Sequence, residues 1–208
     1  MARKNKPKVI ALDYDDTLVN FQGLLCDIHN RLYDTCVYPS DFTEYDIKKL
    51  EVTDARGTHV KGIDIYETFK KYEGIGLYSA LKPLDGARRA LHLIHKLGYK
   101  IIIVTARSEE YRDQTIFNLL HQNLDYDEIH FCPSSEKAKT IRRLSKEYNI
   151  VAFVDDKAAT CADVAENTNV NTVYMVDQAH NRSFESDDIK RIDSVFELIR
   201  DLRDISEG

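Results

Sequence analysis

The sequence predicts an α/β fold in which a parallel β-sheet lies between two layers of helices. Apolar runs of strand length alternate along the chain with segments of helical periodicity, and polar side chains that could carry chemistry follow several of these runs. An aromatic-rich stretch at about residues 20–81 interrupts this alternation. Together these observations predict a Rossmann-like core that carries a mostly helical insertion.

Five apolar runs are typical of strands buried in a parallel sheet. The first, from Val9 to Leu12, ends in a group of carboxylates, and the others are Lys100 to Thr105, Glu128 to Phe131, Ile150 to Val154 and Thr172 to Val176. Helical patterns lie between them at residues 86–97, 108–123, 134–148 and 158–167. We expect most aromatic rings of the inserted stretch to form a small core of their own.

The composition is that of an ordinary globular protein, with 43% apolar and 31% charged residues among 208. This length suits one core domain with a modest insertion, and no apolar run approaches the roughly 20 residues needed to span a bilayer. A net charge of -6 argues against a broad surface for polyanions, so long nucleic acid is not an expected partner. The N-terminal basic residues predict a ragged tail rather than a secretory signal: Arg3, Lys4, Lys6 and Lys8.

The four cysteines, Cys26, Cys36, Cys132 and Cys161, are scattered and form no CxxC pair. This pattern favours reduced thiols in a cytoplasmic protein over disulfides or a zinc site.

Asp13 and Asp15 follow the first strand and are two residues apart, so on an extended backbone their side chains project to the same face. Like charges this close are stabilised by a cation between them, and a hard divalent ion with oxygen ligands is the usual one. The alternative is a solvated acidic turn. A magnesium site becomes the stronger hypothesis because Thr105, Asp155 and Asp156 also follow strands, and ligands of open α/β sheets bind at the carboxyl ends of strands.

The order Asp-x-Asp-x-Thr, strand-end Thr, Lys and Asp-Asp resembles the haloacid dehalogenase (HAD) superfamily of aspartate-nucleophile phosphotransferases. The resemblance implies that Asp13 attacks phosphorus and that Asp15 protonates the leaving oxygen and later activates water. It also implies that Asp13, Asp155 and the backbone carbonyl of Asp15 hold Mg²⁺, with Asp156 orienting that shell. Residues 1–19 and 82–208 would form the HAD core, and 20–81 a C1-type cap.

By the same resemblance, Thr105 and the backbone N–H groups of Ala106 and Arg107 cradle phosphate oxygens at the start of the next helix. Thr105 could instead be a helix N-cap, and Arg107 could be an exposed surface arginine rather than a phosphate contact.

The lysine that neutralises the transition state follows from helical phase. Lys137 lies on the same face of the predicted helix as apolar residues that follow it at intervals of four, three and four residues. Lys139 instead lies on a face of this helix that carries charged residues. We therefore predict Lys137, with Lys157 as a weaker alternative. Lys137 would lie in the first turn of its helix, where a cation needs a nearby anion such as Asp13.

Within the superfamily the chain most resembles the 5'(3')-deoxyribonucleotidase family, in the segments DYDDTLVNFQG, LKPLDGA, VDDKAAT and YMVDQAHNR. This implies a (deoxy)nucleoside monophosphate as substrate, with Phe21 stacked on the base or, alternatively, packed in the cap. The Thr105-Ala106-Arg107 turn and the following helix also resemble the phosphatase domain of polynucleotide kinase-phosphatases. A polynucleotide 3'-phosphatase or another small-metabolite phosphatase is therefore the alternative. A cap over the strand ends favours a small substrate in a closed chamber.

Two alternative functions outside the phosphatases are a response-regulator receiver and a non-catalytic nucleotide-binding module. Chain order argues against a receiver, in which the acidic pair comes first and the phosphoacceptor Asp stands alone. The presence of Asp15, which has no structural need, argues against a binding module. Base and sugar preference, phosphate position, physiological pathway and a possible homodimer stay open.

Overall fold

The computed structural model describes residues 6–207, and its central feature is a six-stranded parallel sheet with the strand order β5-β4-β1-β6-β7-β8. The strands are β1 (Lys8–Leu12), β4 (Lys100–Thr105), β5 (Glu128–Phe131), β6 (Asn149–Asp155), β7 (Thr172–Val176) and β8 (Ile189–Ile192). The predicted α/β class with a parallel sheet is confirmed.

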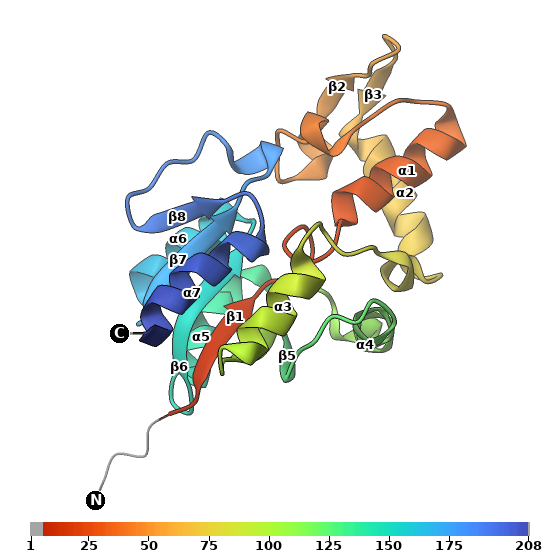
Figure 1. Ribbon diagram of the computed structural model, residues 1–208. Coiled ribbons are helices and arrows are strands. Elements are labelled where there is room, and N and C mark those ends of the chain that lie inside the picture. The colour runs from red at the N-terminus through yellow and green to blue at the C-terminus, as the bar shows by residue number, and fades with distance from the viewer. Residues whose placement is uncertain (1–5, 208) are drawn as a thin grey trace, which may run out of the picture.

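Helices cover both faces of this sheet, which gives the core three layers (Figure 1). They are α3 (Ala87–Lys96), α4 (Arg112–His121), α5 (Lys137–Leu144), α6 (Ala158–Asn167) and α7 (Leu198–Glu207). Alternate residues of β1 face opposite layers, because side chains of a strand alternate in direction. Ile10 and Leu12 pack with α3 and α7, and Val9 and Ala11 with α5 and α6.

Strand β1 lies in the middle of the sheet, between β4 and β6. The chain first builds outward from β1 through β4 to β5, and then returns to the other side of β1 to add β6, β7 and β8. This reversal is a topological switch point, where open α/β sheets hold their ligands at the carboxyl ends of the strands. The ends of β1, β4 and β6 therefore meet at one edge.

A tight turn after β1 sends the chain out of the sheet. The N–H groups of Leu18 and Val19 both donate to the carbonyl of Tyr14, and Asp16 adopts a positive φ of 52°. The outgoing and returning connections are paired, since the Asn20 N–H donates to the carbonyl of Lys82. The insertion is therefore fixed to the core close to the carboxyl end of β1.

The inserted segment forms a lobe beside the sheet, shown in orange to yellow in Figure 1. It contains α1 (Phe21–Tyr33), a hairpin of β2 (Glu51–Thr53) and β3 (His59–Lys61), and α2 (Gly62–Glu73). Its buried cluster is mostly aliphatic and consists of Leu25, Cys26, Val37, Phe42, Leu50, Val52, Val60 and Ile65. The expectation that most aromatic rings form this core is wrong: Phe42 is the aromatic residue among these buried members, Tyr72 and Tyr78 pack in the cluster of the main sheet, and Tyr33, Tyr38 and Tyr45 are about half exposed.

Several element boundaries differ from the sequence prediction. Lys8 begins β1 instead of belonging to a basic tail, and Lys6 donates to the carbonyl of Ser145, while Arg3 and Lys4 lie outside the described residues. The helical pattern at 134–148 yields an α-helix that ends at Leu144. Strand β8 and the β2–β3 hairpin were not predicted, because each strand is short and has few buried positions.

All four cysteines are free thiols. Among residues 6–207 no helix combines the length and the apolar character that a membrane crossing requires.

Candidate active site

The site begins where β1 and β6 end side by side. The register pairs Leu12 with Val154, and the Asp13 N–H continues this ladder by donating to the carbonyl of Val154 at 2.8 Å. Asp13 and Asp155 are consequently neighbours at the strand ends, and both are buried. The structure thus brings together two carboxylates that are far apart in the sequence.

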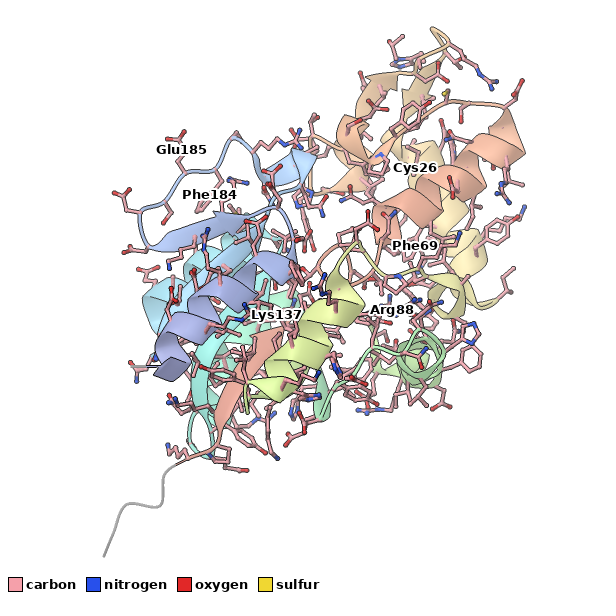
Figure 2. All side chains as sticks on the ribbon, viewed as in Figure 1. Cys26, Phe69, Arg88, Lys137, Phe184 and Glu185 are labelled. Atoms are coloured by element: carbon pink, nitrogen blue, oxygen red, sulfur yellow. The ribbon has the colours of Figure 1, made fainter. Side chains whose placement is uncertain are left out.

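Lys137, at the start of α5, lies between these carboxylates. Its Nζ is 2.7 Å from Asp13 Oδ1 and 2.7 Å from Asp155 Oδ2. The Lys137 side chain is almost completely buried (labelled in Figure 2). Burial disfavours the charge of Lys137, but the two carboxylates outweigh this effect and raise its pKa. Lys137 is therefore a fixed cation at the carboxyl ends of the strands.

The other two candidate lysines lie elsewhere. Lys139 is exposed and pairs with Glu136, so it belongs to the solvated side of α5 as its phase predicted. Lys157 donates to Ser134 Oγ at 3.2 Å, and its Nζ lies 4.1 Å from the centre of the Tyr45 ring. Neither ammonium group makes the contact with Asp13 that Lys137 makes.

Asp13, Asp155 and Asp156 form a buried acidic cluster, with one oxygen of each within 4.8 Å of the others. Burial, opposed by Lys137, raises the pKa of Asp13 to about 7. Burial also raises the pKa values of Asp155 and Asp156, and the negative charges of the cluster add to the effect. Three buried carboxylates share one ammonium group, which leaves negative charge that a divalent cation would balance. The donor set consists of hard oxygens, and it therefore fits Mg²⁺.

The Asp15 carboxylate turns away from this cluster and toward Arg107. Arg107 donates from Nε to Asp15 Oδ2 at 2.7 Å and from Nη2 to Asp15 Oδ1 at 2.5 Å, which is a bidentate pair. The third contact of the guanidinium runs from Nη1 to Thr115 Oγ1 at 3.0 Å. All of these bonds hold Asp15 in one orientation beside the acidic cluster.

The guanidinium of Arg107 is also enclosed between two aromatic rings. Its carbon lies 4.4 Å from the centre of the Tyr14 ring and 4.1 Å from that of the Tyr78 ring, and the residue is only 6% exposed. The alternative of an exposed surface arginine is therefore wrong. Tyr78 belongs to the segment that returns from the insertion, so the core and the insertion together hold this arginine.

Thr105 is completely buried at the end of β4, and its Oγ1 accepts from the Arg107 N–H at 3.3 Å. Helical structure starts only at Glu109, after a turn, and its N-cap is Ser108. The interpretation of Thr105 as a helix N-cap is therefore wrong, and so is the expectation that Ala106 and Arg107 lie at the start of the helix. Ala106 is exposed within this turn.

Phe21 packs in the seam between the core and the insertion. Its ring meets Phe69 edge-on at 5.6 Å and stacks on Tyr78 at 6.4 Å between centroids, and it is half-buried. Figure 2 labels Phe69 on α2, on the inserted side of this seam. The structure thus shows the packing contact that was the alternative to base stacking.

Sequence reasoning missed three residues around Asp156. His180 Nε2 lies 3.2 Å from Asp156 Oδ2, Gln22 contacts the other ring nitrogen of His180, and the Tyr45 ring meets His180 edge-on. Burial, followed by the negative charges of the acidic cluster, raises the pKa of the Tyr45 phenol. His180 lies in the segment YMVDQAHNR, which the sequence had singled out without giving the histidine a role.

Comparison with known proteins identifies a matching family and a similar curated protein. Residues 7–162 match the family described as haloacid dehalogenase-like hydrolase. The curated protein "Putative nucleotidase YqfW" of Bacillus subtilis (strain 168) is 22% identical over 191 residues, which are 92% of this chain and 91% of that protein.

Solved structures with the same architecture include a haloacid dehalogenase-like hydrolase from Streptococcus pneumoniae. Its TM-score is 0.60 at 13% identity, with 93% of this chain and 97% of that chain covered. L-2-haloacid dehalogenase from Xanthobacter autotrophicus has a TM-score of 0.59 at 14% identity, with 96% and 99% covered. At these identities the two structures show a common fold.

Proposed function

The chain belongs to the haloacid dehalogenase-like hydrolase family, and from this premise we propose that it is a Mg²⁺-dependent phosphatase with Asp13 as its nucleophile. The observation that carries the proposal is Lys137, whose ammonium group contacts both Asp13 and Asp155 at 2.7 Å. A buried, permanently charged lysine beside a strand-end aspartate is suited to hold an anion next to a carboxylate nucleophile. Residues 20–81 act in this proposal as a cap over the site.

In the first step an Asp13 oxygen forms a bond to phosphorus while the bond from phosphorus to the leaving oxygen breaks. Asp15 gives its proton to that oxygen. In the second step Asp15 takes a proton from water, and the water oxygen replaces Asp13 on phosphorus. Lys137 stays charged throughout and offsets the negative charge that the phosphoryl group brings next to Asp13.

Arg107 limits when Asp15 can carry a proton. In this structure both Asp15 oxygens accept hydrogen bonds from Arg107. One of these oxygens has to be released and take up a proton from solvent before Asp15 can give that proton to the leaving group. This contact replaces the direct phosphate contact expected for Arg107, and it makes Arg107 a positioning residue for Asp15.

Asp13, Asp155 and the backbone carbonyl of Asp15 would hold the Mg²⁺, and Asp156 would orient that shell. When bound, the cation would neutralise charge on the phosphoryl oxygens. Thr105 and the N–H groups of the turn after β4 would bind the remaining phosphoryl oxygens. The reduced cysteines favour a cytoplasmic location.

For the substrate we propose a (deoxy)nucleoside monophosphate. The support is the full-length similarity to a protein named as a nucleotidase and the resemblance of four segments to the deoxyribonucleotidase family. Phe21 lies in the seam where a base would stack, although its ring is already packed against Phe69. A stacked base would therefore take the face of Phe21 that protein atoms leave open.

Phosphate release from a substrate panel tests this proposal. The panel contains 5'- and 3'-(deoxy)nucleoside monophosphates, sugar phosphates and a 3'-phosphorylated oligonucleotide, each with Mg²⁺ and with EDTA. We expect hydrolysis of the monophosphates that EDTA abolishes. A preference for the oligonucleotide would move the assignment to end processing, and sugar phosphates as the best substrates would exclude the nucleotidase. No release from any substrate would overturn the phosphatase itself.

A further inference from the structure

His180 is the residue at which the insertion and the acidic cluster meet. It follows β7 and its side chain is only 2% exposed. Its Nε2 lies 3.2 Å from Asp156 Oδ2, and its Nδ1 lies 3.3 Å from the amide nitrogen of Gln22 on α1. Tyr45, from another part of the insertion, contacts the edge of the same ring at 5.4 Å between centroids.

The partners of His180 determine the direction of these hydrogen bonds. His180 Nε2 lies 3.2 Å from the backbone carbonyl oxygen of Asp156 as well as from Oδ2, and a carbonyl oxygen only accepts, so Nε2 carries the hydrogen that is donated to Asp156. In the neutral ring Nδ1 is then an acceptor, and the Gln22 amide donates to it. The result is a continuous chain from α1 of the insertion through His180 to Asp156.

Gln22 has two further features that tie it to the site. Its backbone N–H donates to Asp16 Oδ1 at 2.9 Å, which anchors the start of α1 to the turn after β1. Its side-chain Oε1 is buried and has no hydrogen-bond partner among the described residues. A buried acceptor without a partner is unfavourable, so this oxygen is available to an O–H donor that enters the site.

We propose that Gln22 and His180 are positioning residues that hold Asp156 for the cation and thereby couple closure of the insertion to cation binding. This inference rests on the proposed function. With the insertion closed, Gln22 keeps the His180 ring directed at Asp156, and Asp156 keeps one orientation. If the insertion moves away, Tyr45 leaves with it and α1 turns at its anchored start, so His180 loses the contacts that fix its ring.

The coupling has to act in both directions, because the linkage of two binding events is reciprocal. Closure of the insertion strengthens cation binding, and a bound cation therefore stabilises the closed insertion. This prediction is open to measurement without any substrate.

The test uses Mn²⁺ as the probe, because electron paramagnetic resonance separates free from bound Mn²⁺. The full-length protein is compared with Gln22→Met, which keeps the side-chain length but removes the amide. Gln122→Met makes the same chemical change at the C-terminal end of α4, where the Gln122 side chain accepts from Arg88 at 2.8 Å, and serves as the matched control. Gln22→Asn, which retains an amide but is too short to reach His180, provides a second variant if Gln22→Met does not fold.

We expect the Gln22 variants to bind Mn²⁺ more weakly by up to about 10-fold, the lower end of the range for loss of an outer contact, because Gln22 acts on Asp156 through His180. We also expect Mn²⁺ to slow hydrogen exchange of α1 in the wild type and in Gln122→Met, but not in the Gln22 variants. This inference would be overturned if the Gln22 variants bound Mn²⁺ with wild-type affinity, or if Mn²⁺ slowed hydrogen exchange of α1 equally in these variants and in the wild type. Either result would leave the phosphatase proposal intact. No Mn²⁺ binding by the wild-type protein would instead remove the proposed function, and the coupling with it.

Discussion

Replacement of Arg107 by lysine separates its two possible roles. The structure gives Arg107 three side-chain hydrogen bonds, two to Asp15 and one to Thr115. Lysine keeps the positive charge, but it has no planar fork and can retain only one bond to Asp15. Arg107→Lys therefore keeps the electrostatics of the site and removes the orientation of Asp15.

The size of the effect follows from the lost bonds. Lysine forfeits one hydrogen bond to a charged carboxylate and one to a neutral hydroxyl, in a position where the arginine side chain is 2% exposed. This loss predicts a decrease of about 2–4 kcal/mol in the free energy of unfolding. A displaced proton donor costs about 100-fold in rate for a shift of the order of 1 Å, so we expect kcat to fall by about that factor.

The assay is steady-state phosphate release from the best monophosphate, together with urea unfolding. If Arg107 positions Asp15, kcat falls while KM stays close to the wild-type value. If Arg107 instead binds the phosphate, KM rises and kcat changes little. Coupling between Arg107→Lys and Asp15→Asn in a double-mutant cycle measures the pair directly. Additive effects on unfolding, or a change confined to KM, would refute the positioning role.

Three further outcomes follow from the buried charges. Asp13→Asn should abolish turnover, because an amide cannot replace the carboxylate nucleophile. The circular dichroism spectrum should stay unchanged, because burial already raises the pKa of Asp13 to about 7 and a neutral amide therefore suits the site. Wild-type phosphatase rates in this variant would contradict the assignment of Asp13 as the nucleophile. Lys137→Met should lower the free energy of unfolding by about 3–5 kcal/mol, since two buried carboxylates lose their cation, and urea unfolding that matches the wild type would contradict this. His29, buried against Thr68 between α1 and α2, has its pKa lowered from 6.5 by burial, so the unfolded chain binds its proton more readily. The contribution of neutral His29 to the free energy of unfolding should therefore be fully present above pH 6.5 and be lost as the pH falls below it. His29→Gln should reduce this loss, as measured by denaturation midpoints from pH 7.5 to 5.

Strand ends and helical phase were predictable because they depend on local patterns and one topological rule. The apolar runs located β4 and β7 at their observed bounds, and alternation with helices predicted the parallel sheet. In such a sheet the carboxyl ends of neighbouring strands meet, which brings Asp13 and Asp155 together. The phase of α5 likewise directed Lys137 to the interior and Lys139 to solvent.

Tertiary packing alone decided which side chains pair across long separations in the chain. Arg107 lies 92 residues from Asp15, and nothing in its local sequence distinguishes a phosphate ligand or a surface arginine from a buried partner of a carboxylate. Gln22 and His180 are 158 residues apart and meet only because the insertion folds back onto the segment after β7. Local periodicity fixes the direction of a side chain within its own element, whereas its partner depends on how whole elements dock, and that docking placed Arg107 on Asp15 and His180 on Asp156.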